Sequence, residues 1–129
     1  MHDRWFKLVV VLLLFGLLGT RGLNEPDEGR YAEIGREMAE TGDWLVPNIW
    51  YVPHLDKPPM AYWLVGLSIA GFGLNEWAIR LPIALSGLSG AIAIYLLALS
   101  IAGRRVAKWS VLILCSSILY WAIARMVMT

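Results

Sequence analysis

The chain has 129 residues, 58% of them hydrophobic, and a mean hydropathy of +0.59. A soluble domain of this length rarely carries so much apolar surface, so the composition predicts an integral membrane protein. The formal net charge of +1 gives no reason to expect nucleic acid as a partner, and a single cysteine, Cys115, excludes a disulfide within the chain. Nearly all acidic residues lie between Glu25 and Glu76, which places the polar chemistry between apolar segments.

Residues 1–22 are predicted to form the first transmembrane helix. The run Leu8–Thr20 is uncharged and bounded by basic residues, whose long stems extend it to roughly the twenty residues that a span needs. The alternative is a cleaved signal peptide. However, Gly19-Thr20-Arg21 lacks the usual small-residue cleavage pattern, and further apolar segments follow.

Residues 23–76 are predicted to form a loop on the outer side of the membrane. A helix from about Pro26 to Thr41 is expected, because proline suits a first helical turn and Thr41-Gly42-Asp43 resembles a helix end. Asp27 and Glu28 would favour the positive end of its dipole. An apolar stripe on this helix leads back to Asp27, which suggests that the helix lies along the membrane surface.

The other faces of this predicted helix are charged, with Glu33, Arg36, Glu37 and Glu40 at neighbouring helical positions. Such pairs are ordinary on solvated helix surfaces. We therefore assign these four side chains to a solvated face.

Pro58–Asn75 is apolar but slightly short for a membrane span. If it does not span, the basic loop 104–108 falls on the cytoplasmic side together with the basic N-terminus, as the positive-inside rule prefers. We therefore favour an interfacial or partly embedded helix, with a fourth span as the alternative.

Residues 77–103 are predicted to form the second transmembrane helix, 104–108 a cytoplasmic loop and 109–129 the third helix. The second contains the uncharged run Leu81–Gly103, which has Pro82 in its first turn, where proline is tolerated, and Arg80 is expected to snorkel at its outer end. Gly87 and Gly90 favour close packing between helices.

Asp27 and Lys57 are the candidate site residues. A carboxylate held beside an acceptor hydroxyl can act as a general base. Lys57, followed by two prolines, and Arg30, one turn after Asp27, could hold a phosphate or diphosphate. The plainer alternatives are a helix-terminal charge for Asp27 and a snorkelling side chain for Lys57.

Several spaced motifs carry a resemblance. They are Glu25-Pro26-Asp27-Glu28 with Arg30-Tyr31-Ala32, Gly42-Asp43-Trp44-Leu45-Val46-Pro47, Lys57-Pro58-Pro59 with Tyr62-Trp63, and Arg80-Leu81-Pro82. In this order they resemble the membrane glycosyltransferases that use polyprenyl-phosphate sugars, the family of the aminoarabinose transferases for lipid A and the protein O-mannosyltransferases.

The resemblance implies an all-α integral membrane fold, the N-terminal part of a C-type glycosyltransferase helical bundle with interfacial helices in the first outer loop. It assigns the catalytic role to Asp27 and substrate binding to Lys57, Arg30, Tyr31 and Glu28. Asp56 stands where the family commonly has Glu. No cofactor is implied with certainty, and the need for a divalent metal stays open.

The implied reaction moves a sugar from a polyprenyl-phosphate donor to a hydroxyl or phosphate of a glycolipid such as lipid A, or of a protein, with inversion. The phosphate leaves as a stabilised anion, so one base suffices. The expected location is the inner membrane, with the first loop periplasmic and membrane lipids as further partners.

Because members of this family are several hundred residues long, we expect this chain to be an N-terminal part, inactive alone. One alternative is a small three-span assembly subunit without catalysis. Another is part of a transporter, which the charge-free stretches 81–103 and 109–124 disfavour.

Overall fold

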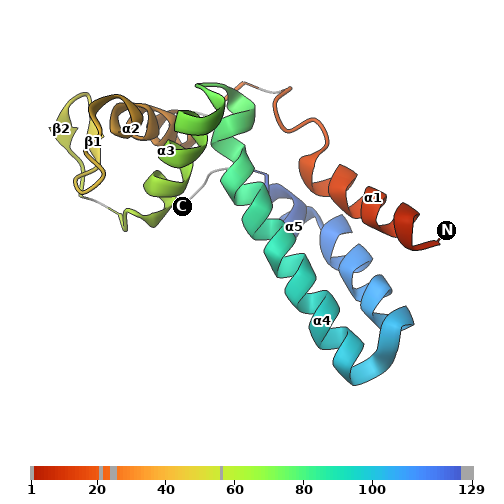
Figure 1. Ribbon diagram of the computed structural model, residues 1–129. Helices are drawn as coiled ribbons and strands as arrows, with labels where there is room; N and C mark the ends of the chain where they lie inside the picture. Colours follow the sequence, from red (N-terminus) through yellow and green to blue (C-terminus); the bar gives the residue numbers. More distant parts are fainter. Residues whose placement is uncertain (1, 21, 24–25, 56, 126–129) are drawn as a thin grey trace. The chain divides into compact units, whose positions relative to one another are not determined.

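The computed structural model describes residues 2–20, 22–23, 26–55 and 57–125, and these are mostly helical (Figure 1). They form two compact units. One contains residues 2–16 and 83–125, and the other contains residues 17–82. The predicted helical fold is confirmed, and the described residues also contain one short β-hairpin that was not predicted.

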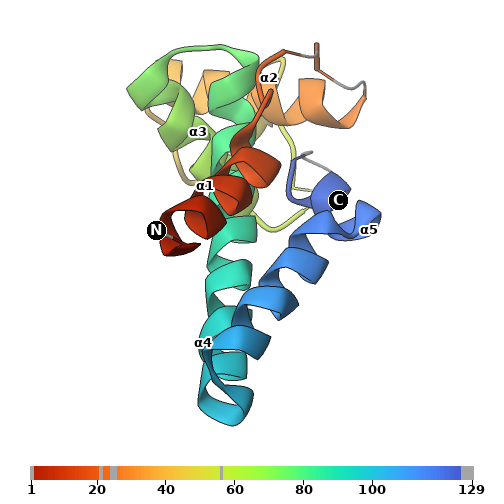
Figure 2. The ribbon, with the colours of Figure 1, turned by 90° about the vertical axis from the view of Figure 1, so that its right-hand side faces the viewer.

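The first unit is built from α1 (His2–Phe15), most of α4 (Glu76–Ser116) and α5 (Ile118–Ile123). Figures 1 and 2 show α1 beside the two halves of α4, which run in opposite directions. Their shared core is apolar and consists of Val10, Leu14, Ala91, Val111, Cys115 and Ala124. Cys115 is therefore a packed core residue, as burial of a free cysteine usually indicates.

The first helix is shorter than predicted. α1 ends at Phe15, where the amide of Gly16 still donates to the carbonyl of Leu12 at 2.9 Å. Leu17 then takes a left-handed conformation with φ of 57°, and the hydroxyl of Thr20 donates to its carbonyl at 2.9 Å. Gly16 lowers helix stability, and the turn at Leu17 follows it. The helix therefore ends before residue 22, the predicted end.

The predicted loop at 104–108 is wrong, because these residues are helical. The chain reverses at Gly103 alone, whose φ of 82° and ψ of 174° interrupt α4. A residue without Cβ adopts such angles at little cost, so one glycine replaces the five-residue loop. The second helix also begins at Glu76, which puts Pro82 in its second turn and not its first.

The predicted third helix, 109–129, is interrupted at Ser117, which is extended with ψ of 131°. Its hydroxyl accepts a hydrogen bond from the amide of Tyr120 at 3.2 Å and so caps α5. Residues 126–129 lie outside the described residues. The close packing predicted at Gly87 and Gly90 is confirmed, because Cβ atoms there would lie 2.7 Å from Ala124 and 2.8 Å from the Tyr120 hydroxyl.

Among the described residues, α4 is the one helix that is long and apolar enough to cross a membrane by length and composition. Its segment before Gly103 is roughly 40 Å long at about 1.5 Å per residue, more than a hydrocarbon core of about 30 Å requires.

The second unit consists of α2 (Asp27–Thr41), the hairpin β1 (Asn48–Ile49) and β2 (Val52–Pro53), α3 (Met60–Phe72) and the start of α4. The strands are antiparallel, with Asn48 opposite Pro53. α2 packs chiefly on α3, which has 13 residues, too few for a span of about twenty. Its length agrees with the interfacial or partly embedded helix that we favour.

Pro82 explains a hydrogen bond between α3 and α4. Proline has no amide hydrogen, so it cannot donate to the carbonyl of Ala78 one turn earlier. The buried hydroxyl of Ser68 donates to that carbonyl instead, at 2.6 Å. This bond joins α3 to the first turns of α4 and leaves no buried acceptor unsatisfied there.

Candidate active site

The first turn of α2 carries the predicted base. Pro26 occupies the N-cap position, Asp27 and Glu28 follow, and Gly42 ends the helix in the left-handed conformation with φ of 73°. The predicted helix is confirmed at both ends. Asp27 is half-buried, so its carboxylate remains within reach of a ligand.

Glu28 is held by a buried ion pair with Arg80. The guanidinium Nε and Nη2 donate to the two carboxylate oxygens at 2.9 and 2.7 Å, and both side chains are essentially inaccessible. Arg80 also donates to the carbonyls of Leu18 and Gly22, each at 2.9 Å. One side chain thus joins the first turn of α2, the segment after α1 and the start of α4.

Two expectations from the sequence need correction here. Arg80 was expected to snorkel, but it is 2% exposed. Glu28 was expected to bind substrate, but its carboxylate is 0% exposed and engaged by Arg80. A buried charge needs a charged partner, so an arginine at the start of a long apolar helix indicates that a carboxylate packs against it. The sequence does not show which of the acidic residues this is, and the fold identifies it as Glu28.

Lys57 lies close to α2. Its Nζ atom is 6.0 Å from the centroid of the Tyr31 ring, and that ring packs on the ring of Tyr62 with centroids 4.8 Å apart. Tyr31 follows Asp27 by one helical turn, so the two side chains share a face of α2. The structure therefore brings Lys57 and Tyr31 together at the end of the helix that carries Asp27.

Arg30 is half-buried, and no ion pair joins it to Asp27 in the part of the chain that the structure describes. Asp56, the residue before Lys57, lies outside the described residues. Within those residues, no group of three or more metal-ligating side chains is present.

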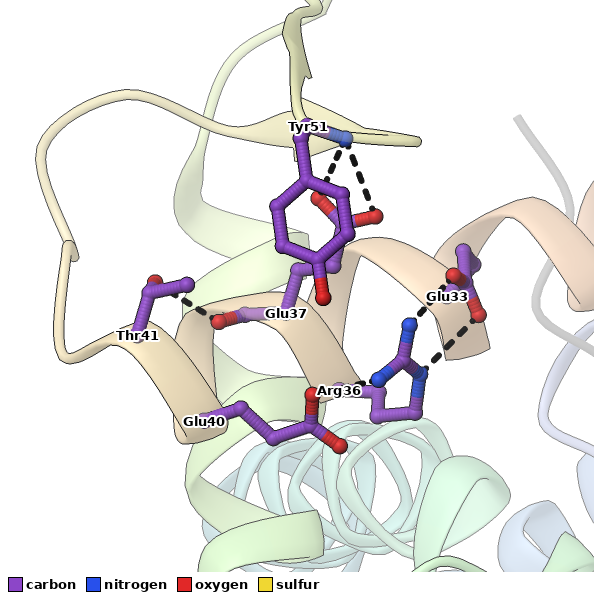
Figure 3. Close-up of polar contacts among 6 residues, drawn as sticks. All are labelled: Glu33, Arg36, Glu37, Glu40, Thr41 and Tyr51. Carbon is purple, nitrogen blue, oxygen red and sulfur yellow. Dashed lines mark hydrogen bonds and ion pairs between the residues drawn. The ribbon is translucent and has the colours of Figure 1, made fainter.

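Three of the predicted surface charges form a network on α2 (Figure 3). Arg36 donates to Glu33 at 3.1 and 2.6 Å and pairs with Glu40 one turn later. Hydrogen bonding to Arg36 lowers the pKa of the Glu33 carboxyl below its usual value. The prediction of a solvated charged face is confirmed for these three residues.

Glu37 is the exception, because its side chain is 1% exposed. Both carboxylate oxygens accept the backbone amide of Tyr51, at 3.2 and 3.1 Å, as Figure 3 shows. Trp50 and Tyr51 have φ of 55° and 60°, a conformation that costs a non-glycine residue about 1–2 kcal/mol. Glu37 therefore fastens the hairpin turn to α2.

A cavity of about 430 Å³ lies on the other side of α2. Gly29, Ala32 and Glu33 line it, together with residues from the α3–α4 connection and Ile79. These α2 positions are roughly opposite Asp27 and Tyr31 on the helix. The cavity is therefore separate from the face that carries the predicted site residues.

Comparison with known proteins identifies the family. Residues 56–129 match the family described as dolichyl-phosphate-mannose-protein mannosyltransferase. An undecaprenyl phosphate-alpha-4-amino-4-deoxy-L-arabinose arabinosyl transferase of Edwardsiella ictaluri is 36% identical over 122 residues, which cover 92% of this chain and 22% of that protein. Its counterpart in Pseudomonas savastanoi is 42% identical over 104 residues, covering 76% of this chain and 19% of the relative.

The fold agrees. The crystal structures of ArnT from Cupriavidus metallidurans, in the apo state and bound to undecaprenyl phosphate, superpose with a TM-score of 0.91 at 36% identity. Each alignment covers 97% of this chain and 23% of that protein. The chain thus spans about a fifth of the length of these relatives.

The motifs, the helical fold and the relatives agree on the family. The chain belongs to the dolichyl-phosphate-mannose-protein mannosyltransferase family, within its membrane glycosyltransferases that use polyprenyl-phosphate sugars.

Proposed function

We propose that the complete protein transfers a sugar from a polyprenyl-phosphate donor to an acceptor hydroxyl or phosphate, with inversion. The observation that carries this proposal is the position of Lys57 over Tyr31, one helical turn from Asp27. A cation and a carboxylate at the same end of α2 supply the two functions that the reaction needs. The relatives, named as arabinosyl transferases, support the same chemistry.

In the proposed step, the acceptor oxygen attacks the anomeric carbon while the bond from that carbon to the phosphate oxygen breaks. The acceptor proton passes to Asp27 as general base. The bonding electron pair leaves with the phosphate, whose charge Lys57 and Arg30 stabilise. Attack opposite the leaving group inverts the anomeric centre.

Tyr31 positions Lys57 through its ring face, a cation–π contact that the 6.0 Å separation allows. Glu28 acts as a positioning residue through Arg80 and not as a ligand of the substrate. The proposed acceptors are a lipid A-like glycolipid or a protein.

The proposed location is the bacterial inner membrane, with residues 23–76 on the periplasmic side. Only the polar head group of a long isoprenoid donor then has to leave the lipid phase. Placement of the basic residues after Gly103 on the cytoplasmic side agrees with the positive-inside rule.

The test is sugar transfer from a radiolabelled polyprenyl-phosphate donor in membranes that contain the complete protein, with Asp27→Asn compared with wild type at matched expression. We expect transfer to fall at least about 100-fold, the usual effect of losing a general base, with donor binding retained. Glu40→Gln, a surface carboxylate on the same helix, is the matched control. Unchanged transfer in Asp27→Asn would return the residue to the plainer alternative of a helix-terminal charge.

A further inference from the structure

A groove in the first unit has apolar walls and a cluster of cations. Its volume is about 510 Å³, within the range of small-molecule sites. It lies between α1 and the two halves of α4. Its apolar walls include Val10, Val11, Leu88, Ile92, Tyr95 and Val111.

The charged part of the lining carries excess positive charge. Lys7, Arg104 and Lys108 contribute three cations, and Asp3 contributes the carboxylate that faces them. Asp3 forms an ion pair with Lys108, and its other oxygen is 3.7 Å from Nη1 of Arg104. One carboxylate therefore balances one of three cations, and Lys7 is exposed to a ligand.

We propose that this groove binds an anionic phospholipid of the surrounding membrane, with its phosphate at Lys7 and Arg104 and one acyl chain along the apolar walls. The excess positive charge disfavours a neutral lipid. A free phosphate has no apolar part that could contact the walls. Basic pockets between transmembrane helices are known to hold anionic head groups. The groove is in the unit that does not contain Asp27 or Lys57, so this inference is independent of the proposed reaction.

The first test measures lipid binding to the complete protein by native mass spectrometry in mild detergent, with phosphatidylglycerol or phosphatidylcholine added. The variant Lys7→Gln/Arg104→Gln removes two groove cations. The control Arg4→Gln/Arg105→Gln removes two exposed arginines that do not line the groove. We expect phosphatidylglycerol binding to be roughly thirtyfold weaker in the first variant, which is the combined effect of losing two membrane-surface cations. Binding should change little in the control.

A second test locates the lipid within the groove. Ile92 lines the wall and is 50% exposed, so a photo-crosslinking amino acid at this position should form adducts with phosphatidylglycerol in nanodiscs. Val11→Trp, which narrows the groove without changing charge, should reduce these adducts. Both variants leave Asp27 and Lys57 intact, so sugar transfer serves as the check on folding.

The proposal is overturned by equal affinity for phosphatidylglycerol and phosphatidylcholine, or by equal losses in the two double variants. Adducts from Ile92 to another segment of the protein in place of lipid would also overturn it. Preferential binding of polyprenyl phosphate over phosphatidylglycerol would identify a donor site and would equally reject it.

Discussion

Arg80→Met tests whether the buried pair with Glu28 holds the first turn of α2. The substitution keeps most of the side-chain volume but removes both guanidinium hydrogen bonds to the buried Glu28 carboxylate. It also leaves the carbonyls of Leu18 and Gly22 without the guanidinium. Removing one partner of a buried pair typically costs about 3–5 kcal/mol, and the two carbonyls add to that loss.

Hydrogen exchange of the α2 amides in micelles measures the local opening of this unit. A loss of 3–5 kcal/mol predicts exchange faster by roughly 150-fold to several thousandfold. Arg36→Met is the matched control, because this arginine also pairs with carboxylates but its side chain is 25% exposed. Its two exposed pairs contribute together about 0–2 kcal/mol, so the control should change exchange less than roughly 30-fold.

The double variant Glu28→Met/Arg80→Met gives a test of sign. With both charges gone, no uncompensated carboxylate remains buried, so α2 should exchange more slowly than in Arg80→Met alone. Equal effects of Arg80→Met and Arg36→Met would show that the buried pair does not hold the first turn of α2. A further loss in the double variant would show the same.

Three further substitutions have defined outcomes. Lys57→Gln should weaken polyprenyl-phosphate binding by roughly 10- to 150-fold in a filter-binding assay, because it removes a charged donor worth about 1.5–3 kcal/mol. Glu37→Gln should speed exchange of the Tyr51 amide by about tenfold, since a neutral amide oxygen accepts more weakly than a carboxylate. Gly87→Leu should lower the free energy of unfolding of the purified protein by about 1–3 kcal/mol, because a Cβ atom at this position would lie 2.7 Å from the Cβ atom of Ala124.

Glu37→Gln and Gly87→Leu each have a control on a helix. Lys57→Gln should leave Tyr51 exchange unchanged, and Glu40→Gln should not alter it either. Gly71→Ala in α3 meets no atom within 4 Å and should not destabilise the protein as Gly87→Leu does. Equal effects of a substitution and its control would count against the contact concerned.

Local sequence signals predicted α2 well. Pro26 and Gly42 act within one turn of the helix ends, and the left-handed φ of 73° at Gly42 is what glycine tolerates best. Gly103 shows the limit of such signals. The uncharged run to this residue was read correctly as a helix, but a single glycine suffices for the reversal and the basic residues after it start a new helix.

Contacts distant in sequence were beyond prediction. Glu28 and Arg80 are 52 residues apart, and Glu37 and Tyr51 are 14 apart. Periodicity placed Glu37 among exposed charges, because nothing local indicated that a hairpin would cover it. Burial of a carboxylate depends on what packs against the helix, and only the fold supplies that.

The site residues differ in what holds them. Arg80 fixes Glu28, the neighbour of Asp27 in the chain, with a bidentate pair and two backbone carbonyls. Tyr31, one helical turn after Asp27, is buried against Tyr62, and the Nζ atom of Lys57 lies over its ring. The backbone around Asp27 is thus fixed on both sides, while its side chain stays half-exposed. Such preorganisation lowers the free-energy cost of aligning a base with an acceptor. Arg80→Met should therefore reduce sugar transfer even though Asp27 and Lys57 are intact.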